Sequence, residues 1–323
     1  MKKSLLLTGA LLIVVLLSVM YGTTFLSLGD LQQILLGKAS ASQSLIFWNF
    51  RLPRTLIALI GGCGLAYSGF LLQGTTRNDL ADGSILGINS GAGFLVLLYL
   101  GFFAQGSVLV LPILAIFGGI LAAVIVFGLA FQQKQRLSME KLLLAGIAVN
   151  AGFSALTLLV TIRISKDSYS FVTSWLAGSI WGTSWTSVSL LFPLIACFGL
   201  LAYRRVPLLP LLGLGEERAI SLGIRITHER MLLLGLAATM AASCVAFTGN
   251  LGFIGLLAPH ISKAWLKKES RQSFLVSGGI GSLLVLGADI LGRLLLPSGE
   301  VPAGIVIAII GAPYFLYLLI KAK

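Results

Sequence analysis

The chain has 323 residues, of which 57% are apolar and only 11% are charged, and its formal net charge is +12. Its mean hydropathy of +0.99 excludes a soluble globular core. Because a helix needs about 20 apolar residues to cross a hydrocarbon layer of roughly 30 Å, runs of that length predict an all-α polytopic membrane protein. Three cysteines lie in apolar runs without CxxC spacing, which indicates neither a disulfide framework nor a metal site: Cys63, Cys197 and Cys244.

Ten segments are predicted to be transmembrane helices. The first follows Lys2 and Lys3 as a signal peptide would, but no small-residue cleavage site closes it, so we interpret it as a retained helix. No extramembrane domain is predicted, and we expect residues 1–323 to form a single transmembrane domain. The predicted spans are 4–25, 54–74, 84–103, 108–130, 139–162, 185–203, 230–250, a short 252–262, 273–293 and 303–320.

The basic residues predict how these helices are oriented. With the N-terminus inside, 17 of the 23 Lys and Arg residues lie inside and six lie outside. Because cytoplasmic loops collect Lys and Arg, this split predicts that both termini are cytoplasmic. It also accounts for most of the net charge, so a nucleic acid partner is not indicated. The six outer residues are Lys38, Arg51, Arg54, Arg163, Lys166 and Arg293.

A weak internal repeat accompanies this topology. The segment Ala66-Tyr67-Ser68-Gly69 follows Cys63, and the similar segment Ala246-Phe247-Thr248-Gly249 follows Cys244. The two spans are predicted to run in opposite directions, as an inverted repeat requires. Chance similarity is the alternative explanation, because the match covers only four residues in a chain of strongly biased composition.

The chain lacks the sequence features of an enzyme or of a self-powered transporter. It has no GxxxxGK[ST] nucleotide loop, no HExxH motif and no Ser-His-Asp set. Ion-coupled transporters usually carry acids or histidines within the membrane, whereas only Asp289 lies well inside a predicted span. A transporter that is driven by other subunits is therefore favoured over an ion-coupled carrier or a membrane-embedded enzyme.

The segment Arg51-Leu52-Pro53-Arg54 precedes the second span. Proline is favoured in the first helical turn, so Pro53 is predicted to start this helix and to place Arg54 near its N-terminus. An arginine at that position opposes the helix dipole. We therefore expect a compensating anion beside it, either a lipid phosphate or an acidic partner.

Residues 51–94, RLPRTLIALIGGCGLAYSGFLLQGTTRNDLADGSILGINSGAGF, resemble the signature region of the iron-siderophore and cobalamin ABC importer permeases. Further blocks match that family in the same order: WLAGS at 175–179, LGEERAISLG at 214–223, GFIGLLAPH at 252–260, and EVPAG at 300–304 followed by GAP at 311–313. The resemblance covers essentially the whole chain. It implies about ten helices in an inverted-repeat permease architecture, a second permease subunit (identical or paralogous), cytoplasmic ATPase subunits and an extracytoplasmic substrate-binding protein.

The resemblance also implies roles for particular residues. Arg51, Arg54 and Arg293 take the positions of outer arginines that meet glutamates of the binding protein. Asp289 precedes Arg293 by four residues, a spacing that allows an intrahelical ion pair. Segment 204–229 takes the position of the element that sits in a cleft of the ATPase, and its glycines and prolines predict one or two short helices there. The residues expected to couple it to the ATPase are Glu216, Glu217, Arg218, Ser221, Leu222 and Gly223.

Gln73 and Asn78 are the residues expected on the translocation path. For Gln73, near the inner end of the second span, a constriction in the path and an interhelical hydrogen bond are equal alternatives. The family usually has prolines where this chain has Asp79 and Gly83, so a more flexible turn is expected. His260 is interpreted as a hydrogen-bonded structural residue rather than as a ligand for iron.

The sequence thus predicts a multi-pass permease of the cell (plasma or inner) membrane, with no cofactor and no catalytic site of its own. We expect it to move a ferric siderophore, first of all a ferric hydroxamate, by alternating access driven by the partner ATPases. Haem or cobalamin is the alternative cargo within the family. An ion-coupled secondary transporter is the alternative mechanism.

Overall fold

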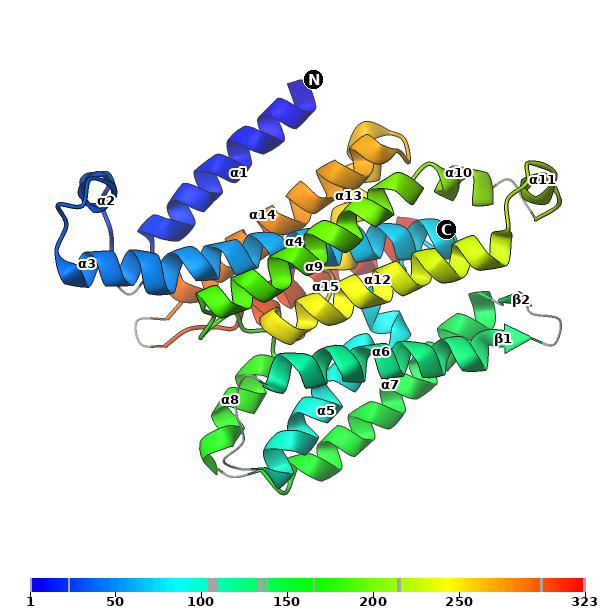
Figure 1. Cartoon of the computed structure of the whole chain (residues 1–323), viewed down its shortest axis with the longest axis horizontal. Coiled ribbons are helices and arrows are strands. Elements are labelled where there is room, and N and C mark those ends of the chain that lie inside the picture. The colour runs from blue at the N-terminus through cyan, green and yellow to red at the C-terminus, as the bar shows by residue number, and fades with distance from the viewer. Residues whose placement is uncertain are drawn as a thin grey trace.

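The computed structural model of the chain describes residues 2–22, 24–103, 110–132, 136–137, 139–164, 166–213, 216–296 and 299–321. It is built almost entirely of helices (Figure 1). The long helices are α1 (Lys2–Met20), α4 (Leu52–Thr76), α5 (Ile88–Phe102), α6 (Leu111–Ala130), α7 (Met139–Thr161), α9 (Trp185–Arg205), α12 (Ile226–Thr248), α13 (Ile254–Leu266), α14 (Arg271–Leu294) and α15 (Ala303–Lys321). The shorter elements are α2 (Leu28–Leu35), α3 (Ala41–Leu45), a π-helical turn (Ile46–Arg51), a 3-10 turn (Gly83–Leu86), α8 (Lys166–Leu176), α10 (Leu208–Leu212), α11 (Glu216–Ser221) and the antiparallel pair β1 (Phe131–Gln132) and β2 (Arg136–Leu137).

Each of the ten predicted spans coincides with one of the long helices. Within the described residues, seven helical stretches are long and apolar enough to cross a membrane, and α5 and α15 are shorter apolar helices. Helix α13 has 13 residues, in keeping with the short eighth segment. The predicted class of an all-helical, multi-pass membrane protein is therefore confirmed. The sequence does not predict α8 or the β1–β2 pair, because elements this short between spans carry no hydropathy signal.

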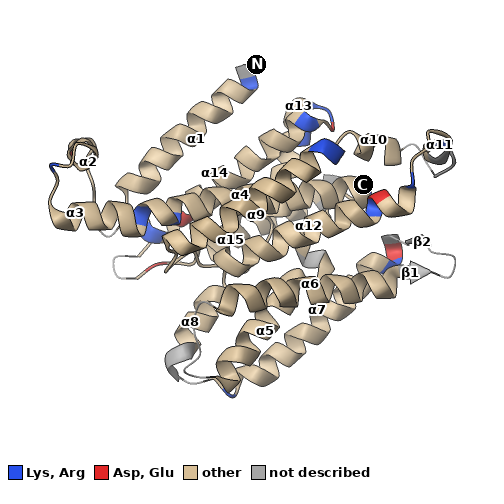
Figure 2. Cartoon of the chain, viewed as in Figure 1, with Lys and Arg blue, Asp and Glu red and all other residues tan. Residues whose placement is uncertain are grey.

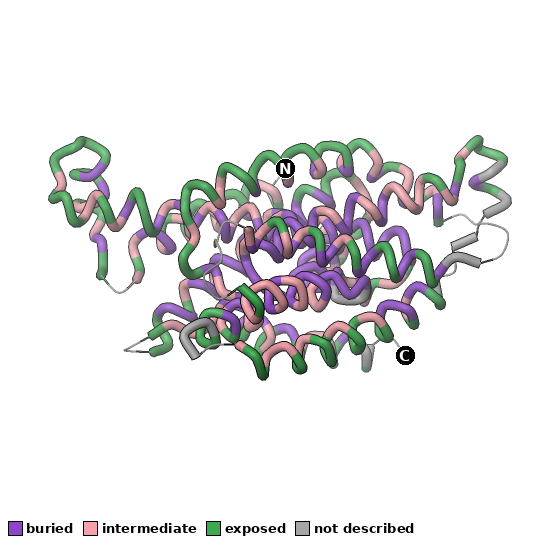
Figure 3. The backbone as a smooth tube through the Cα atoms, turned by 60° about the horizontal axis from the view of Figure 1, so that its bottom comes forward, coloured by how far each residue is buried: buried purple, intermediate pink, exposed green. Residues whose placement is uncertain are grey.

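Helix α4 lies at the centre of the bundle. It packs against α9, α12, α13 and α14, and α12 packs in turn against α6 (Figure 1). Burial falls from the centre outward: 78% of the residues in the apolar stretch of α12 are buried, against 11% of those in the apolar stretch of α7. Figure 3 shows the same gradient, with buried residues in the middle of the bundle and exposed residues along its outer helices. Helix α7 thus presents an apolar surface that this chain leaves largely uncovered.

Glycine allows the central helices to lie in direct contact. A Cβ atom added at Gly69 in α4 would overlap the backbone of Gly255 in α13. One added at Gly62 in α4 would overlap the carbonyl group of Gly281 in α14. Small residues at such positions let membrane helices approach closely. The high glycine content of the chain therefore serves the packing around α4.

Basic residues gather at the two ends of the bundle (Figure 2). We call the end that holds α10, α11 and the β1–β2 pair the α11 end, and the opposite end, where Arg51, Arg54 and Arg293 lie, the arginine end (Figure 1). Helix α1 begins toward the α11 end, where Lys3 Nζ donates a hydrogen bond of 2.7 Å to the carbonyl oxygen of Trp265. Most of the basic residues gather at the α11 end, and a second basic cluster marks the arginine end (Figure 2).

Candidate functional site

The three arginines predicted to dock a partner lie together at one cavity. This cavity has a volume of about 400 Å³, and its lining includes Arg51, Arg54, Arg293 and Glu300. A second cavity of about 560 Å³ shares Arg54, Glu300 and Trp181 with the first. The arginine end is therefore hollowed where its charged side chains meet.

Arg51 connects the end of α1 to the π-helical turn that precedes α4. It is the last residue of the π-helical turn, and only 5% of it is exposed. Its guanidinium donates to the carbonyl oxygens of Val19 (2.6 Å) and Met20 (2.5 Å), and also to that of Thr24. Carbonyl groups at the end of a helix have no partner within it. Arg51 supplies such partners for the last turn of α1 and for the segment beyond it.

Asp289, which is 2% exposed in α14, joins the other two arginines. Its Oδ1 accepts hydrogen bonds from Arg54 Nε (3.0 Å) and Nη2 (2.7 Å), and its Oδ2 pairs with Arg293. The ion pair predicted from the four-residue spacing is thus confirmed, and Arg54 of α4 is an additional partner. Arg293 also donates to the carbonyl oxygens of Ser18 (3.1 Å) and Tyr21 (3.0 Å), so that α14 too holds the end of α1.

Glu300 completes this network from the segment before α15. Its Oε2 lies 2.8 Å from Arg54 Nη2, and the two side chains are 24% and 14% exposed. Three guanidinium groups against the two carboxylates of Asp289 and Glu300 leave one positive charge at the cavity. The anions expected beside Arg54 therefore come from this chain. Glu300 lies in the EVPAG block that resembles the family, and no role was predicted for it from the sequence.

The start of the second span differs from the expectation. Helix α4 does carry Pro53 in its first turn, but α3 and the π-helical turn extend the helical stretch back to Ala41. Arg54 consequently lies inside a long helix, and the argument from the helix dipole at an N-terminus was wrong. The side chain is stabilised instead by carboxylates from α14 and from the segment before α15.

A cavity of about 660 Å³ lies beside α5, α7 and the segment that joins α12 to α13. Helix α7 contributes Asn150, Ser154 and Thr157, whose i, i+4, i+7 spacing places them on one face. Across from them, Asn89 Nδ2 of α5 donates a hydrogen bond of 2.6 Å to Asn250 Oδ1. We call these five residues the polar stripe. The stripe was not predicted from the sequence, although polar residues at helical spacing in an apolar run can indicate such a face.

Of the two predicted path residues, Asn78 lines this cavity and Gln73 is not among its lining residues. Gln73 is 1% exposed, and its Nε2 donates to the carbonyl oxygen of Leu256 in α13 (3.1 Å). Of the two alternatives for Gln73, the structure contains the interhelical hydrogen bond. Asn78 Oδ1 accepts a hydrogen bond of 3.0 Å from the Leu80 amide.

Side chains of the turn that follows α4 accept hydrogen bonds from the backbone of the same turn. Asp82, which also lines the cavity, accepts a hydrogen bond of 2.7 Å from the Gly83 amide. Asp79 Oδ1 lies 3.5 Å from Lys263 Nζ in α13. The hydrogen bonds of Asn78 and Asp82 thus stay within this turn, and the ion pair of Asp79 connects it to α13.

The predicted coupling segment contains two short helices, α10 and α11, as expected from its glycines and prolines. Arg205 at the end of α9 and Glu229 at the start of α12 form an ion pair of 2.6 Å, which joins the helices on either side of the segment. Leu209 and Leu212 of α10 are buried, so this helix packs onto the bundle.

Three of the residues predicted to couple to the ATPase are exposed in α11 or directly after it. Arg218, Ser221 and Leu222 are exposed, and Leu222 is 60% exposed. Gly223 lies two residues after the end of this helix and has a φ of 78°, in the left-handed region that favours glycine. The side chains of Glu216 and Glu217 lie outside the described part of the chain.

His260 connects two helices near the α11 end. Its Nδ1 lies 2.8 Å from the hydroxyl of Tyr314 in α15. This is the structural hydrogen bond that the sequence analysis favoured. Among the residues that the structure describes, no group of three or more His, Cys, Asp or Glu side chains is placed to hold a metal ion.

A multi-pass helical bundle with a hollowed charged end, a cavity lined in part by polar side chains and short helices at its opposite end is the architecture of a membrane transport permease. Residues 10–321 match the FecCD transport family, and the chain belongs to that family. The predicted resemblance to the iron-siderophore ABC importer permeases is thereby confirmed.

Individual relatives agree with this assignment. The iron(3+)-hydroxamate import system permease protein FhuG of Bacillus subtilis is 39% identical over 90% of this chain and 88% of its own length. The Fe(3+)-citrate import system permease protein YfmE of the same organism is 37% identical over 98% of this chain and 93% of its own. The hemin transport system permease protein HmuU of Yersinia pestis is 35% identical over 86% and 84%.

A solved structure has the same fold along the whole chain. It is described as an inward-facing conformation of a metal-chelate type ABC transporter. It covers 99% of both chains at 31% identity, with a TM-score of 0.87. The chain is accordingly a multi-pass membrane permease of the ABC transporter class.

Proposed function

We propose that the chain is the membrane-spanning permease subunit of a binding-protein-dependent ABC importer for ferric siderophores, of the hydroxamate type. The polar stripe carries this proposal. Its amide and hydroxyl groups line a cavity of about 660 Å³ and suit a hydrophilic chelate that passes without giving up its metal. The relative named for iron(3+)-hydroxamate import has 39% identity, against 37% and 35% for the citrate and hemin relatives.

We propose that all ten long helices cross the membrane as one domain, with the α11 end in the cytoplasm and the arginine end outside. The gathering of Lys and Arg at the α11 end supports this orientation (Figure 2). Helices α4 and α12, which carry the two similar four-residue segments, run in opposite directions in Figure 1. This arrangement agrees with an inverted repeat.

A second permease subunit completes the path in this proposal. Helix α7 is apolar, and only 11% of the residues in its apolar stretch are buried within the chain. The same helix bears Asn150, Ser154 and Thr157 of the polar stripe. A partner subunit that covers α7 would enclose the cavity between two copies and shield it from lipid. The partner is identical to this chain or a paralogue.

The arginine end serves as the docking surface for the external binding protein. The cavity where Arg51, Arg54 and Arg293 meet has one positive charge in excess, which attracts an acidic side chain. In the free permease Glu300 forms an ion pair with Arg54. On docking, a carboxylate of the binding protein replaces Glu300 as the partner of Arg54. Charge complementarity of this kind accelerates association and weakens with salt.

Substitution of Arg54 tests the docking surface. Arg54→Glu is expected to weaken the association of the binding protein, mainly by lowering the association rate constant at low salt. Lys38→Glu is the matched control, because Lys38 is an exposed basic residue of the same end that lies outside the cavity lining. Replacing the partner carboxylate on the binding protein with a basic residue should restore part of the affinity between that protein and the Arg54→Glu variant. Equal effects of the two substitutions would remove Arg54 from the docking surface.

At the α11 end, α10 and α11 transmit the motion of the ATPases. Helix α11 is followed by exposed Leu222 and left-handed Gly223, and the Arg205–Glu229 ion pair joins the two helices that flank the segment. ATP-driven closure of the ATPases moves this segment and switches the bundle between outward-facing and inward-facing states. The coupling residues are those predicted from the sequence, with Glu216 and Glu217 included.

Uptake of labelled cargoes tests the assigned substrate. The reconstituted complex with its binding protein is supplied in turn with ferric hydroxamate, ferric citrate and haem. Ferric hydroxamate should accumulate in preference to the other two. Asn150→Leu, which removes an amide from the polar stripe, should slow that uptake, whereas Asn150→Gln should largely retain it. Preferential accumulation of haem would replace the hydroxamate assignment with the haem alternative.

A further inference from the structure

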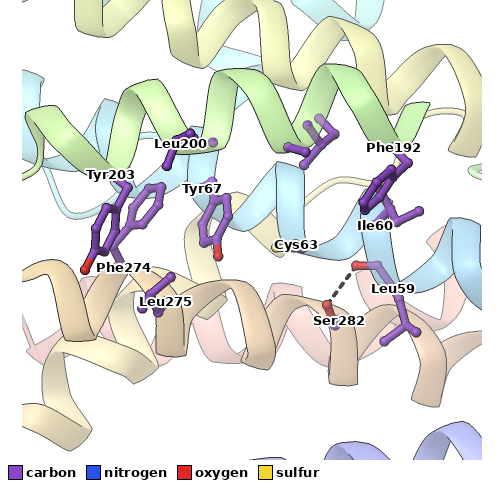
Figure 4. A pocket seen from close by; sticks show the side chains of 13 residues that line it. Leu59, Ile60, Cys63, Tyr67, Phe192, Leu200, Tyr203, Phe274, Leu275 and Ser282 are labelled. Carbon is purple, nitrogen blue, oxygen red and sulfur yellow. Dashed lines mark hydrogen bonds between the residues drawn. The ribbon is translucent and has the colours of Figure 1, made fainter. Parts of the chain in front are cut away.

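An apolar groove that no transport step uses opens between α4, α9 and α14. Its volume is about 560 Å³. Figure 4 shows Phe192 and Leu59 at one end of the groove and Tyr203 and Phe274 at the other, with Tyr67 between them. The end with Tyr203 is the α11 end, because Tyr203 lies in the last turn of α9. The groove therefore runs along the bundle from its interior toward the α11 end.

The length of the groove matches one leaflet of a bilayer. Phe192 and Tyr203 are eleven residues apart on α9, which corresponds to about 16 Å along the helix axis. One leaflet contributes half of a hydrocarbon core of about 30 Å. A groove of this length accommodates an acyl chain that lies parallel to the helices.

The walls of the groove suit hydrocarbon rather than a polar ligand. Apart from Ser282 and two tyrosine hydroxyls, the side chains that line it are aliphatic, aromatic or thiol groups. The hydroxyl of Ser282 is already used, since it donates a hydrogen bond of 2.8 Å to the Leu59 carbonyl oxygen (Figure 4). Filling an apolar groove of this kind with hydrocarbon is favourable, because the side chains that line it form dispersion contacts with the hydrocarbon.

Basic side chains stand at the α11 end of the groove. The guanidinium carbon of Arg271 lies 5.2 Å from the centre of the Tyr203 ring. Arg204, the next residue along α9, is exposed, as are Lys267 and Lys268 before α14. In the described part of the chain, neither Arg204 nor Arg271 forms an ion pair with a carboxylate within 4.0 Å. Their charge is therefore available to an anion at the surface of that leaflet.

We infer that this groove binds one anionic glycerophospholipid. An acyl chain fills the space between α4, α9 and α14, and the phosphate lies against Arg271 and Arg204. Each basic residue near an anionic membrane surface contributes about 1 kcal/mol, which corresponds to about fivefold in affinity. The lipid bridges α9, which leads into the coupling segment, to the central helix α4.

Native mass spectrometry of the full complex tests this inference. The complex is released from mixed micelles that contain phosphatidylglycerol and phosphatidylcholine, and the retained lipids are counted. Retention of phosphatidylglycerol in preference to phosphatidylcholine is expected. Arg271→Gln should lower the affinity for phosphatidylglycerol about fivefold. Arg163→Gln, which changes an exposed basic residue of the arginine end, should leave it unchanged.

A second variant tests the acyl chain. A Cβ atom at Gly199 would lie 3.5 Å from the Tyr67 ring, an ordinary contact, so a side chain can start at this position, and Gly199→Leu is chosen to fill the groove. It should abolish the bound lipid, whereas Gly128→Leu, at an exposed site on α6 with open space around it, should not. Equal retention of the two lipids, retention by Gly199→Leu, or displacement of the lipid by inorganic phosphate alone would each overturn the inference. The Arg271 variant keeps the test decisive if Gly199→Leu fails to assemble.

Discussion

Replacement of Asp289 by alanine should destabilise the bundle more than any other single carboxylate substitution that we consider. Asp289 is 2% exposed and holds both Arg54 and Arg293. Removing one partner of a buried ion pair typically costs about 3 to 5 kcal/mol, because the remaining charge is left uncompensated. Arg54 keeps Glu300 at 2.8 Å and Arg293 keeps the carbonyl oxygens of α1. We therefore expect the lower end of that range, about 3 kcal/mol.

The assay for this prediction is reversible unfolding of the purified chain in mixed detergent micelles. Asp289→Asn should have an intermediate effect, since the amide oxygen still accepts a hydrogen bond but the charge is lost. Asp79→Asn is the control: Asp79 is 69% exposed and 3.5 Å from Lys263, so a loss of at most about 1 kcal/mol is expected. If Asp289→Ala and Asp79→Asn shift the free energy of unfolding equally, the buried network does not stabilise the bundle and the reasoning fails.

Three further predictions concern packing, coupling and pH. Gly69→Leu should prevent correct folding, because its Cβ would overlap the Gly255 backbone, whereas Gly128→Leu should fold normally; the yield of monodisperse protein separates the two. Gly223→Val should cost about 1 to 2 kcal/mol in its left-handed conformation and abolish ATP-coupled uptake, and normal uptake would argue against a coupling role. Hydrogen bonds from the Ser27 hydroxyl and amide lower the pKa of Asp30 from 3.8, so its stabilisation of α2 should persist above that pH and be lost as the pH falls through the lowered pKa. The protection factors of the α2 amides, which correct exchange rates for their intrinsic pH dependence, should be lower below the lowered pKa of Asp30 than at pH 6, and Asp30→Asn should not show this difference.

The helices could be predicted from the sequence, because the length and apolarity of each segment follow from the thickness of the membrane. The ion pair of Asp289 with Arg293 could be predicted as well, since it depends only on helical spacing. The pairing of Asp289 with Arg54 could not, because those residues are 235 positions apart and meet only where α4 packs against α14. Gln73 is similar: its partner in α13 follows from close glycine packing, which sequence spacing does not specify.

The site was predicted less completely than the fold. The three arginines were found through the family resemblance, and the structure brings them to one cavity together with Glu300. Their burial could not be read from the sequence, because it depends on where the end of α1 lies. Three of the five residues of the polar stripe could be predicted from the helical spacing of Asn150, Ser154 and Thr157 in α7. The other two come from α5 and from the segment before α13, and their position depends on the tertiary structure.

The central claim is that partner ATPases drive ferric siderophore through this permease. The most direct test measures uptake of radiolabelled ferric hydroxamate into proteoliposomes that contain either the complete complex or this chain alone, with ATP or an ion gradient as the energy source. Uptake by the complex should require ATP and the binding protein, and the chain alone should neither hydrolyse ATP nor accumulate iron. Uptake by the chain alone that follows the ion gradient and persists without ATP would contradict the proposed function.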